Sequence, residues 1–371
     1  MSSRECSFST ESTSTGSCTS LPSPTNTGNG PQTPCSSVSE STPDSVLQLH
    51  AIPADAPINI QHAELLIHLT SPSASDIFSL GDGVEPYQGT ISQALKTGLK
   101  APYLLHQLLA FSACHLAYLH PDKRPHYSHQ ATALQTRAIA LFNAQKIDVS
   151  KENCVAICLF SVVLGHHLLA ETLAVAHSCV GTGGIDAFLS RYVQSLSTHR
   201  GVFTVAMTGW THLMSSELSS ILLRSQAFTS AGPRGTECHG LRVLVLQSPT
   251  LDDGEKGACL AAIRYLQLGF DALSTGLGPG PGKGEHENMR FQMLFLWNVL
   301  VPPRYTALLA RKNPEALIVL AYYALLLHHG RHIWQVGEAG RYIFGMIEED
   351  LGAAWDAWLE YPRVGLGTRV G

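Results

Sequence analysis

Three apolar segments follow one another in the C-terminal part of the chain, and each ends at residues that break a helix. The first covers residues 294–300 and ends before a Pro-Pro pair, because proline has no N–H to donate and disfavours helix in the residue before it. The second covers residues 305–311 and ends at an Asn-Pro pair. The third, residues 315–328, is apolar on almost every face, which predicts a central core helix buried on all sides. It is shorter than the roughly 20 apolar residues of a membrane span.

Apolar residues at three- and four-residue steps predict further helices upstream of these segments. We expect them at residues 59–70, 91–97, 101–119, 126–146, 153–174, 186–196 and 260–273. The mixed composition of residues 225–249 predicts a mobile connection, in which residues 241–246 favour a short strand. No period-two pattern recurs often enough to build a sheet. The predicted fold is therefore all-α, a single multi-helix domain at residues 56–366 around the core helix.

The composition separates the first residues from this domain. Residues 1–55 are dominated by Ser, Thr, Pro, Gly and Asn, which predicts a disordered tail or linker, and they lack the apolar segment of a secretory signal. In the whole chain of 371 residues, 44% are hydrophobic and only 14% are charged, which favours a large core or an apolar cavity. The net charge of −5 gives no electrostatic reason to expect direct contact with nucleic acid.

Cysteine and histidine spacings offer few metal ligands. The chain has nine cysteines and no signal sequence, which indicates a reducing, intracellular compartment. Cys154 and Cys158 lie one helical turn apart and are expected to be buried thiols rather than metal ligands. A pair of histidines, His126 and His129, shares a helix face without a third ligand at a suitable spacing. His167 and Glu171, at i and i+4, fit a hydrogen-bonded pair or a partial metal site. We predict no metal site.

One acidic cluster resembles an enzyme motif. Asp252, Asp253 and Glu255 precede a predicted helix, and paired carboxylates on an all-α fold can chelate Mg²⁺ and a diphosphate, as in class I terpene cyclases. Such cyclases have a second metal-binding motif on the opposite side of the cavity. Residues 348–350 (Glu-Glu-Asp) match that second motif poorly. The three residues are better interpreted as acidic helix-start residues that match the helix dipole, without a cofactor. A Mg²⁺-dependent catalytic site is the alternative.

Tryptophans, tyrosines, prolines and glycines recur in an ordered series through the last quarter of the chain. The series is Trp297, Val301-Pro302, Leu308-Leu309, Asn-Pro-Glu-Ala-Leu at 313–317, Leu-Ala-Tyr-Tyr-Ala at 320–324, Trp334, Gly337 to Gly340, Trp355, Trp358 and Tyr361-Pro362. It resembles the C-terminal regulatory domain of fungal binuclear-zinc-cluster (Zn2Cys6) transcription factors, of the sterol uptake control type. Pieces upstream agree in order, so that the resemblance covers about residues 61–366.

The resemblance implies a ligand-sensing domain in the nucleus or cytoplasm that encloses an apolar pocket for a sterol or similar lipid. The side chains expected to line that pocket are aromatic, and two glycines belong to a turn that would move when it fills. These residues are Phe111, Trp297, Tyr323, Trp334, Phe344, Gly337 and Gly340. The family's zinc cluster needs two Cys-x2-Cys-x6-Cys halves, and no Cys-x2-Cys occurs in this chain.

The missing zinc cluster leaves two functions open. As a regulator, the chain would act through a partner, as a homodimer or as a heterodimer with a full-length homologue, and would control sterol or secondary-metabolite genes. As an enzyme of fungal secondary metabolism, it would use the same helical cavity as a Mg²⁺-dependent terpene cyclase or a pericyclase, because such reactions need chiefly a shaped apolar cavity that excludes water.

Overall fold

The computed structural model describes residues 58–71, 88–145, 148–176, 179, 184–275 and 290–367. Within these ranges every regular element is a helix, which confirms the all-α prediction. The chain divides into two compact units, Met1–Ala56 and Pro57–Gly371, and all described residues belong to the second. The tail predicted at residues 1–55 and the loop expected near residues 276–287 lie outside the described residues.

Helix α14, Pro314–His329, is the core helix that the sequence predicts. It begins where Asn313 Oδ1 accepts a hydrogen bond from the Ala316 N–H, and proline fits the next position because its missing N–H would be unpaired there. Every residue from Glu315 to His328 is buried. Helix α14, which is apolar on almost every face, is thus packed against other parts of the fold on every face.

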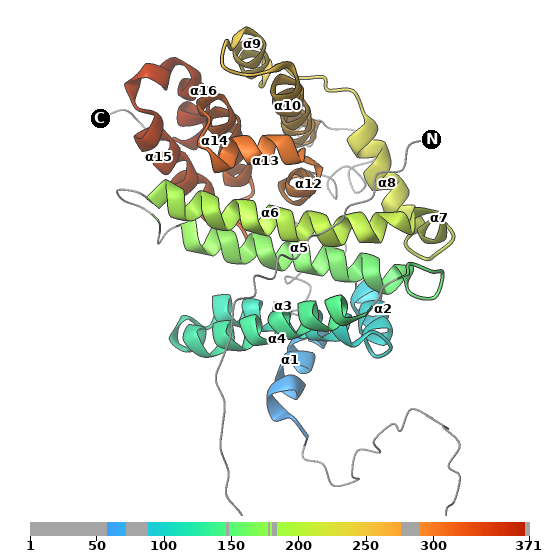
Figure 1. The fold of residues 1–371 in the computed structure, drawn as a ribbon. Helices are drawn as coiled ribbons and strands as arrows, with labels where there is room; N and C mark the ends of the chain where they lie inside the picture. The colour runs from blue at the N-terminus through green and yellow to red at the C-terminus, as the bar shows by residue number, and fades with distance from the viewer. Residues whose placement is uncertain are drawn as a thin grey trace, which may run out of the picture. The chain divides into compact units, whose positions relative to one another are not determined.

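Seven of the helices described in the C-terminal half form one hydrophobic core with α14 and with parts of α5 and α6. Helices α10, α15 and α16 pack directly on α14, and α9, α12 and α13 complete the group (Figure 1). These helices are α9 (His239–Gln247), α10 (Asp253–Thr275), α12 (Gln292–Leu300), α13 (Pro303–Ala310), α15 (Ala339–Leu351) and α16 (Asp356–Leu366), with α8 (Ser219–Ser230) against α10.

The N-terminal helices form a second hydrophobic core. A hairpin of α3 and α4, joined by the short 3-10 turn Pro121–Lys123, carries α1 and α2 on α3. The C-cap of helix α3 is His120, the residue before Pro121, because proline disfavours helix in the residue that precedes it. The helices of this group are α1 (Ile60–Thr70), α2 (Gln88–Gly98), α3 (Pro102–Leu119), α4 (Arg124–Ala144) and the single turn α7 (Trp210–Leu213).

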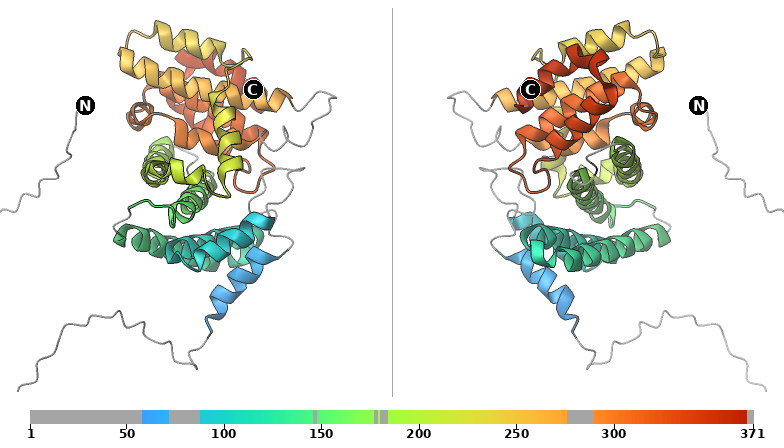
Figure 2. Two further views of the ribbon diagram at one scale, coloured as in Figure 1. Left: turned by 90° about the vertical axis from the view of Figure 1, so that its right-hand side faces the viewer. Right: turned by 90° about the vertical axis from the view of Figure 1, so that its left-hand side faces the viewer.

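Two long helices belong to both cores. Helix α5 (Cys154–Ala176) and helix α6 (Gly184–Thr208) lie side by side between the α3–α4 hairpin and the C-terminal helices (Figures 1 and 2). Among the described helices α5 is, by length and composition, apolar enough to cross a membrane, but 67% of its most apolar window is buried inside the fold. Its hydrophobicity is therefore accounted for by packing against α3 and α6.

Two expectations about secondary structure were wrong. The segment at residues 241–246 is part of helix α9, not a strand, and α8 occupies part of the predicted mobile connection. β-Branched residues such as Val243 and Val245 favour strands locally, but Leu241, Leu244 and Val245 also have helical spacing and are buried together in the C-terminal core. Tertiary burial decided in favour of the helix. Helices α6 and α10 are also longer than predicted.

Candidate functional site

A cleft of about 780 Å³ opens between the α3–α4 hairpin, helices α5 and α6, and the segment that leads into α15. Its volume lies in the range of small-molecule sites in proteins. Apolar side chains such as Leu168 and Tyr342 line it together with the hydroxyl groups of Thr132 and Ser195. Both hydrophobic cores contribute to its walls. An occupant of the cleft would therefore contact both halves of the fold.

The structure brings some of the residues predicted to bind a ligand to this cleft. Trp334 and Gly337 line it. The Phe111 ring, fully buried, lies behind Trp334 with 5.5 Å between ring centroids. Gly337 has a φ of +49°, a left-handed conformation that side chains other than glycine rarely adopt, and this allows the turn between residue 334 and α15.

The other predicted ligand-binding residues lie in the C-terminal core, outside the residues that line the cleft. Trp297 stacks on Tyr323 with centroids 4.2 Å apart, and its Nε1–H donates to the Ala262 carbonyl over 3.0 Å. Phe344 is almost fully buried in the same core. Gly340 lies in the first turn of α15, where the backbone of α14 approaches it closely.

Next to the cleft lies a buried group of polar side chains. His167 of α5 is fully buried, and its Nε2 lies 3.4 Å from Glu171 Oε1, while its Nδ1 lies 3.0 Å from the Gln107 amide nitrogen. Glu171 and Cys114 line the cleft. Burial alone would lower the pKa of His167, but Cys114 and Glu171 together raise it. The two side chains suggested by the i, i+4 spacing are therefore neighbours, close enough for an ion pair when His167 is protonated.

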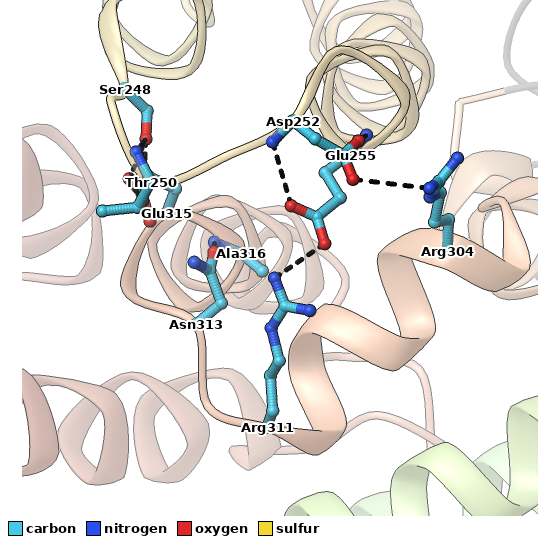
Figure 3. A network of polar contacts seen from close by, with 9 residues as sticks. All are labelled: Ser248, Thr250, Asp252, Glu255, Arg304, Arg311, Asn313, Glu315 and Ala316. Carbon is cyan, nitrogen blue, oxygen red and sulfur yellow. Dashed lines mark hydrogen bonds and ion pairs between the residues drawn. The ribbon is translucent and has the colours of Figure 1, made fainter.

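The acidic cluster Asp252, Asp253 and Glu255 caps a helix. Asp252 Oδ1 accepts the Glu255 N–H over 2.8 Å, and Glu255 Oε2 accepts the Asp252 N–H over 3.1 Å (Figure 3). This reciprocal pattern is a capping box at the start of α10. The remaining carboxylate oxygens are paired with arginines: Glu255 lies 2.8 Å from Arg311 and Asp252 lies 3.4 Å from Arg304. Asp253 is exposed, and none of the three acidic residues lines the cleft.

The capping geometry makes a prediction about stability. Replacing Asp252 with alanine should lower the free energy of unfolding by about 1 kcal/mol, because the Glu255 N–H loses its acceptor. Asp253→Ala is the matched control and should change it by less than about 0.5 kcal/mol, since Asp253 is an exposed surface residue. Urea denaturation measures both. Equal losses in the two variants would contradict the capping interpretation.

The Asn-Pro-Glu-Ala-Leu series at 313–317 also has a structural explanation (Figure 3). Asn313 caps α14, and the proline and glutamate that follow occupy its first turn. The Glu315 carboxylate is buried and accepts hydrogen bonds from the hydroxyl groups of Ser248 and Thr250, on the link between α9 and α10. These bonds lower the pKa of Glu315 although burial acts in the opposite direction. The motif therefore ties α14 to the α9–α10 link.

The remaining metal candidates do not gather into a site. In the part of the chain that the structure describes, no three His, Cys, Asp or Glu side chains are arranged to hold a metal ion. Cys154 and Cys158 are buried thiols, and burial raises the pKa of Cys158 to about 11. His126 and His129 are exposed on α4.

Comparison with known proteins relates the chain to a fungal regulator. No known family profile matches the chain. Over 303 residues the chain is 22% identical to a Zn(2)-C6 fungal-type transcription factor of Gibberella zeae. The alignment covers 79% of this chain and 57% of that protein, so the chain spans little more than half the length of the curated relative. This alignment agrees with the resemblance to fungal zinc-cluster transcription factors that the sequence motifs indicated. The finer resemblance, to the sterol uptake control type, is supported by the sequence motifs alone. The chain is thus distantly similar, over most of its length, to a fungal Zn(2)-C6 transcription factor.

Proposed function

We propose that the chain is a ligand-sensing regulatory domain of a fungal transcription regulator. The observation that carries this proposal is the alignment of 79% of the chain with a Zn(2)-C6 transcription factor. The proposed ligand is an apolar metabolite of the size of a sterol, bound in the cleft beside Trp334. Regulation of sterol or secondary-metabolite genes would take place in the nucleus.

The position of the cleft suggests how binding would be transmitted. Its walls come from α3 and α4 on one side and from α6 and α15 on the other, with α5 between them. Packed interiors rearrange between discrete states rather than deform continuously. A ligand that contacts both sides therefore favours one relative arrangement of the two cores. Gly337, at the cleft and in a left-handed turn, is placed where α15 would move.

Contact with DNA belongs, in this proposal, to a partner. The net charge of −5 does not favour binding of a polyanion, and the sequence holds no zinc-cluster cysteines. Two copies of the chain, or this chain and a full-length homologue, would associate, and the ligand would change that association or the exposure of a surface for a further partner.

A pair of substitutions on α4 tests the cleft. Thr132 lines it and Thr136, one turn away, does not, although both are exposed and both donate to the carbonyl four residues earlier. Thr132→Trp should fill the cleft and weaken binding of an apolar ligand at least about tenfold, as expected when a bulky side chain occupies a binding pocket. Thr136→Trp should bind like the unmodified protein.

The measurement is a thermal-shift screen of the purified full chain against sterols and related apolar metabolites, followed by titration of each stabilising compound. Saturable stabilisation that Thr132→Trp removes and Thr136→Trp keeps supports the proposal. Equal binding by both variants would place the ligand elsewhere. A parallel incubation with Mg²⁺ and farnesyl diphosphate tests the alternative of a terpene cyclase, which requires a hydrocarbon product that Asp253→Ala abolishes.

A further inference from the structure

We infer that the ligand of the cleft is an amphiphilic acid, with an apolar body inside the cleft and one carboxylate held between the side chains of Arg124 and Arg191. The inference rests on the proposed ligand-binding function and specifies the chemical class of the ligand. Long-chain fatty acids and terpenoid acids belong to this class, whereas a sterol with a neutral hydroxyl group does not.

Among the residues that the structure describes, the charged side chains that line the cleft are Arg124, Glu171, Arg191 and Glu338. Each glutamate already has a basic neighbour. Glu171 Oε1 lies 3.4 Å from His167 Nε2, and the Glu338 carboxylate lies 3.3 Å from the guanidinium of Arg341. Within the described residues, neither cleft arginine forms an ion pair. The two positive charges therefore favour a ligand that carries a negative charge.

Helices α3 and α5 run in the same direction beside the cleft. Near the start of both, the rings of Tyr103 and Phe160 lie 5.2 Å apart between centroids. Further along both, the Gln107 amide nitrogen lies 3.0 Å from His167 Nδ1. The two helices therefore end on the same side of the fold. Helix α4 follows α3 after a short turn, so that it begins on that side with Arg124 (Figure 1).

Helix α6 begins on the same side, because it runs antiparallel to α5. A Cβ atom at Gly209, directly after α6, would lie 3.2 Å from the Cβ of Cys154 at the start of α5. Arg191 lies about two turns from the first residue of α6. Both arginines thus lie toward one end of the cleft, on the two helices α4 and α6 that form its opposite walls. A single carboxylate at that end has a guanidinium on either side.

Hydroxyl groups follow each arginine along the cleft. On α4, Thr132 lies about two turns beyond Arg124. On α6, Ser195 and Thr198 lie about one and two turns beyond Arg191. Each of these three O–H groups donates to a main-chain carbonyl of its own helix, over 3.0, 2.8 and 3.0 Å respectively. An ionised carboxylate only accepts hydrogen bonds, so the guanidinium groups are the donors on these two helix faces that suit it.

The rest of the cleft suits the apolar body of such a ligand. Leu168 and Leu173 of α5 line it, together with Trp334 and Tyr342. The two arginines are exposed, so that a carboxylate between them stays close to water and the pairing costs little desolvation. Apolar contacts therefore supply most of the affinity, and the arginines supply the preference for an acid over a neutral compound of the same shape.

Binding of dodecanoic acid and of dodecanol to the full chain tests the inference. The two compounds share one alkyl chain and differ in the head group, and each is titrated at neutral pH below the concentration at which it aggregates. The acid should bind about fivefold more tightly than the alcohol, as expected for ion pairs with two exposed arginines. Raising the NaCl concentration from about 0.05 M to about 0.5 M should remove most of this preference, because salt screens exposed charges.

Substitutions of the arginines assign the preference to its residues. Arg124→Gln and Arg191→Gln should each weaken binding of the acid about twofold and leave binding of the alcohol unchanged, and the double variant should bind both compounds alike. Arg137→Gln is the matched control and should keep the preference, because Arg137 is exposed on α4 but does not line the cleft. Equal binding of acid and alcohol by the unmodified protein, or a preference that survives in the double variant, would overturn the inference.

The neutral compounds separate this inference from the proposed function. If dodecanol or a sterol binds in a way that Thr132→Trp removes, and the acid binds no more tightly than the alcohol, the acid class is refuted and the proposed function stands. If the acid is preferred through the two arginines but does not change the expression of a reporter gene controlled by the chain fused to a DNA-binding domain, the acid site stands and the proposed regulatory function fails.

Discussion

Replacing Gly340 with alanine should lower the free energy of unfolding by about 2–3 kcal/mol, the upper part of the usual cost of overpacking a core. A Cβ atom at this position would lie 2.4 Å from the Ala324 carbonyl oxygen and 2.9 Å from the His328 backbone nitrogen. Both atoms belong to the backbone of α14, so that no side chain can rotate away. Helix α15 would have to move off the core helix.

Gly345 offers the matched control on the same helix. It is exposed, and a Cβ atom at this position would have no neighbour within 4 Å. Gly345→Ala should therefore stabilise the protein by about 0.5–1 kcal/mol, because alanine loses less backbone entropy in a helix than glycine does. Chemical denaturation of the two variants measures the difference. If Gly340→Ala were as stable as Gly345→Ala, the close approach of α14 and α15 would be wrong.

Acidification should destabilise the protein strongly between pH 6.5 and pH 4. Burial lowers the pKa of His115, His166 and His199 to about 4 in each case. In this window the unfolded chain binds protons that the folded chain does not, so stability falls as the pH falls. Each histidine contributes up to about 1.4 kcal/mol per pH unit. His167 has the opposite effect, because its pKa is raised in the folded protein. Its contribution to stability is fully present below pH 6.5 and is lost as the pH rises through the pKa of the folded state.

A substitution at His166 tests the origin of this acid sensitivity. Its ring stacks on Phe295 with centroids 4.2 Å apart, and its Nδ1 lies 3.2 Å from Gln335 Oε1. His166→Phe should reduce the slope of the free energy of unfolding against pH by the equivalent of about one bound proton. Urea denaturation at several pH values measures this slope. Phe295→Leu, which changes the partner ring and no titratable group, should leave the slope unchanged. An unaltered slope in His166→Phe would refute the assignment.

The sequence predicted the core helix well because its pattern leaves no polar face. Helix α14 could not lie at a surface on any side, and its start was marked by Asn313 and Pro314. The acidic helix start at Asp252 followed from the same kind of local rule. Local rules were insufficient at residues 241–246, where strand propensity and helical spacing disagreed and burial against other helices decided.

The cleft could not be predicted in this way, because its lining comes from helices far apart in the sequence. Trp297 and Trp334 look alike in the sequence, yet the first is fully buried in the core and the second lines the cleft. Thr132 and Thr136 lie on the same face of α4 one turn apart, yet only the first lines the cleft. The buried polar pair next to the cleft did leave a signal, because His167 and Glu171 are spaced by four residues. The sequence did not predict the contact between α3 and α5 that brings Gln107 to His167.

The most direct test of the account is a transcription measurement with the full chain fused to a heterologous DNA-binding domain. An apolar compound that stabilises the purified protein should change the expression of a reporter gene, and Thr132→Trp should abolish that response while Thr136→Trp preserves it. Reporter expression that does not respond to any ligand of the purified chain, or a response that Thr132→Trp leaves intact, would contradict the assignment of a ligand-sensing regulatory domain whose ligand lies in the cleft.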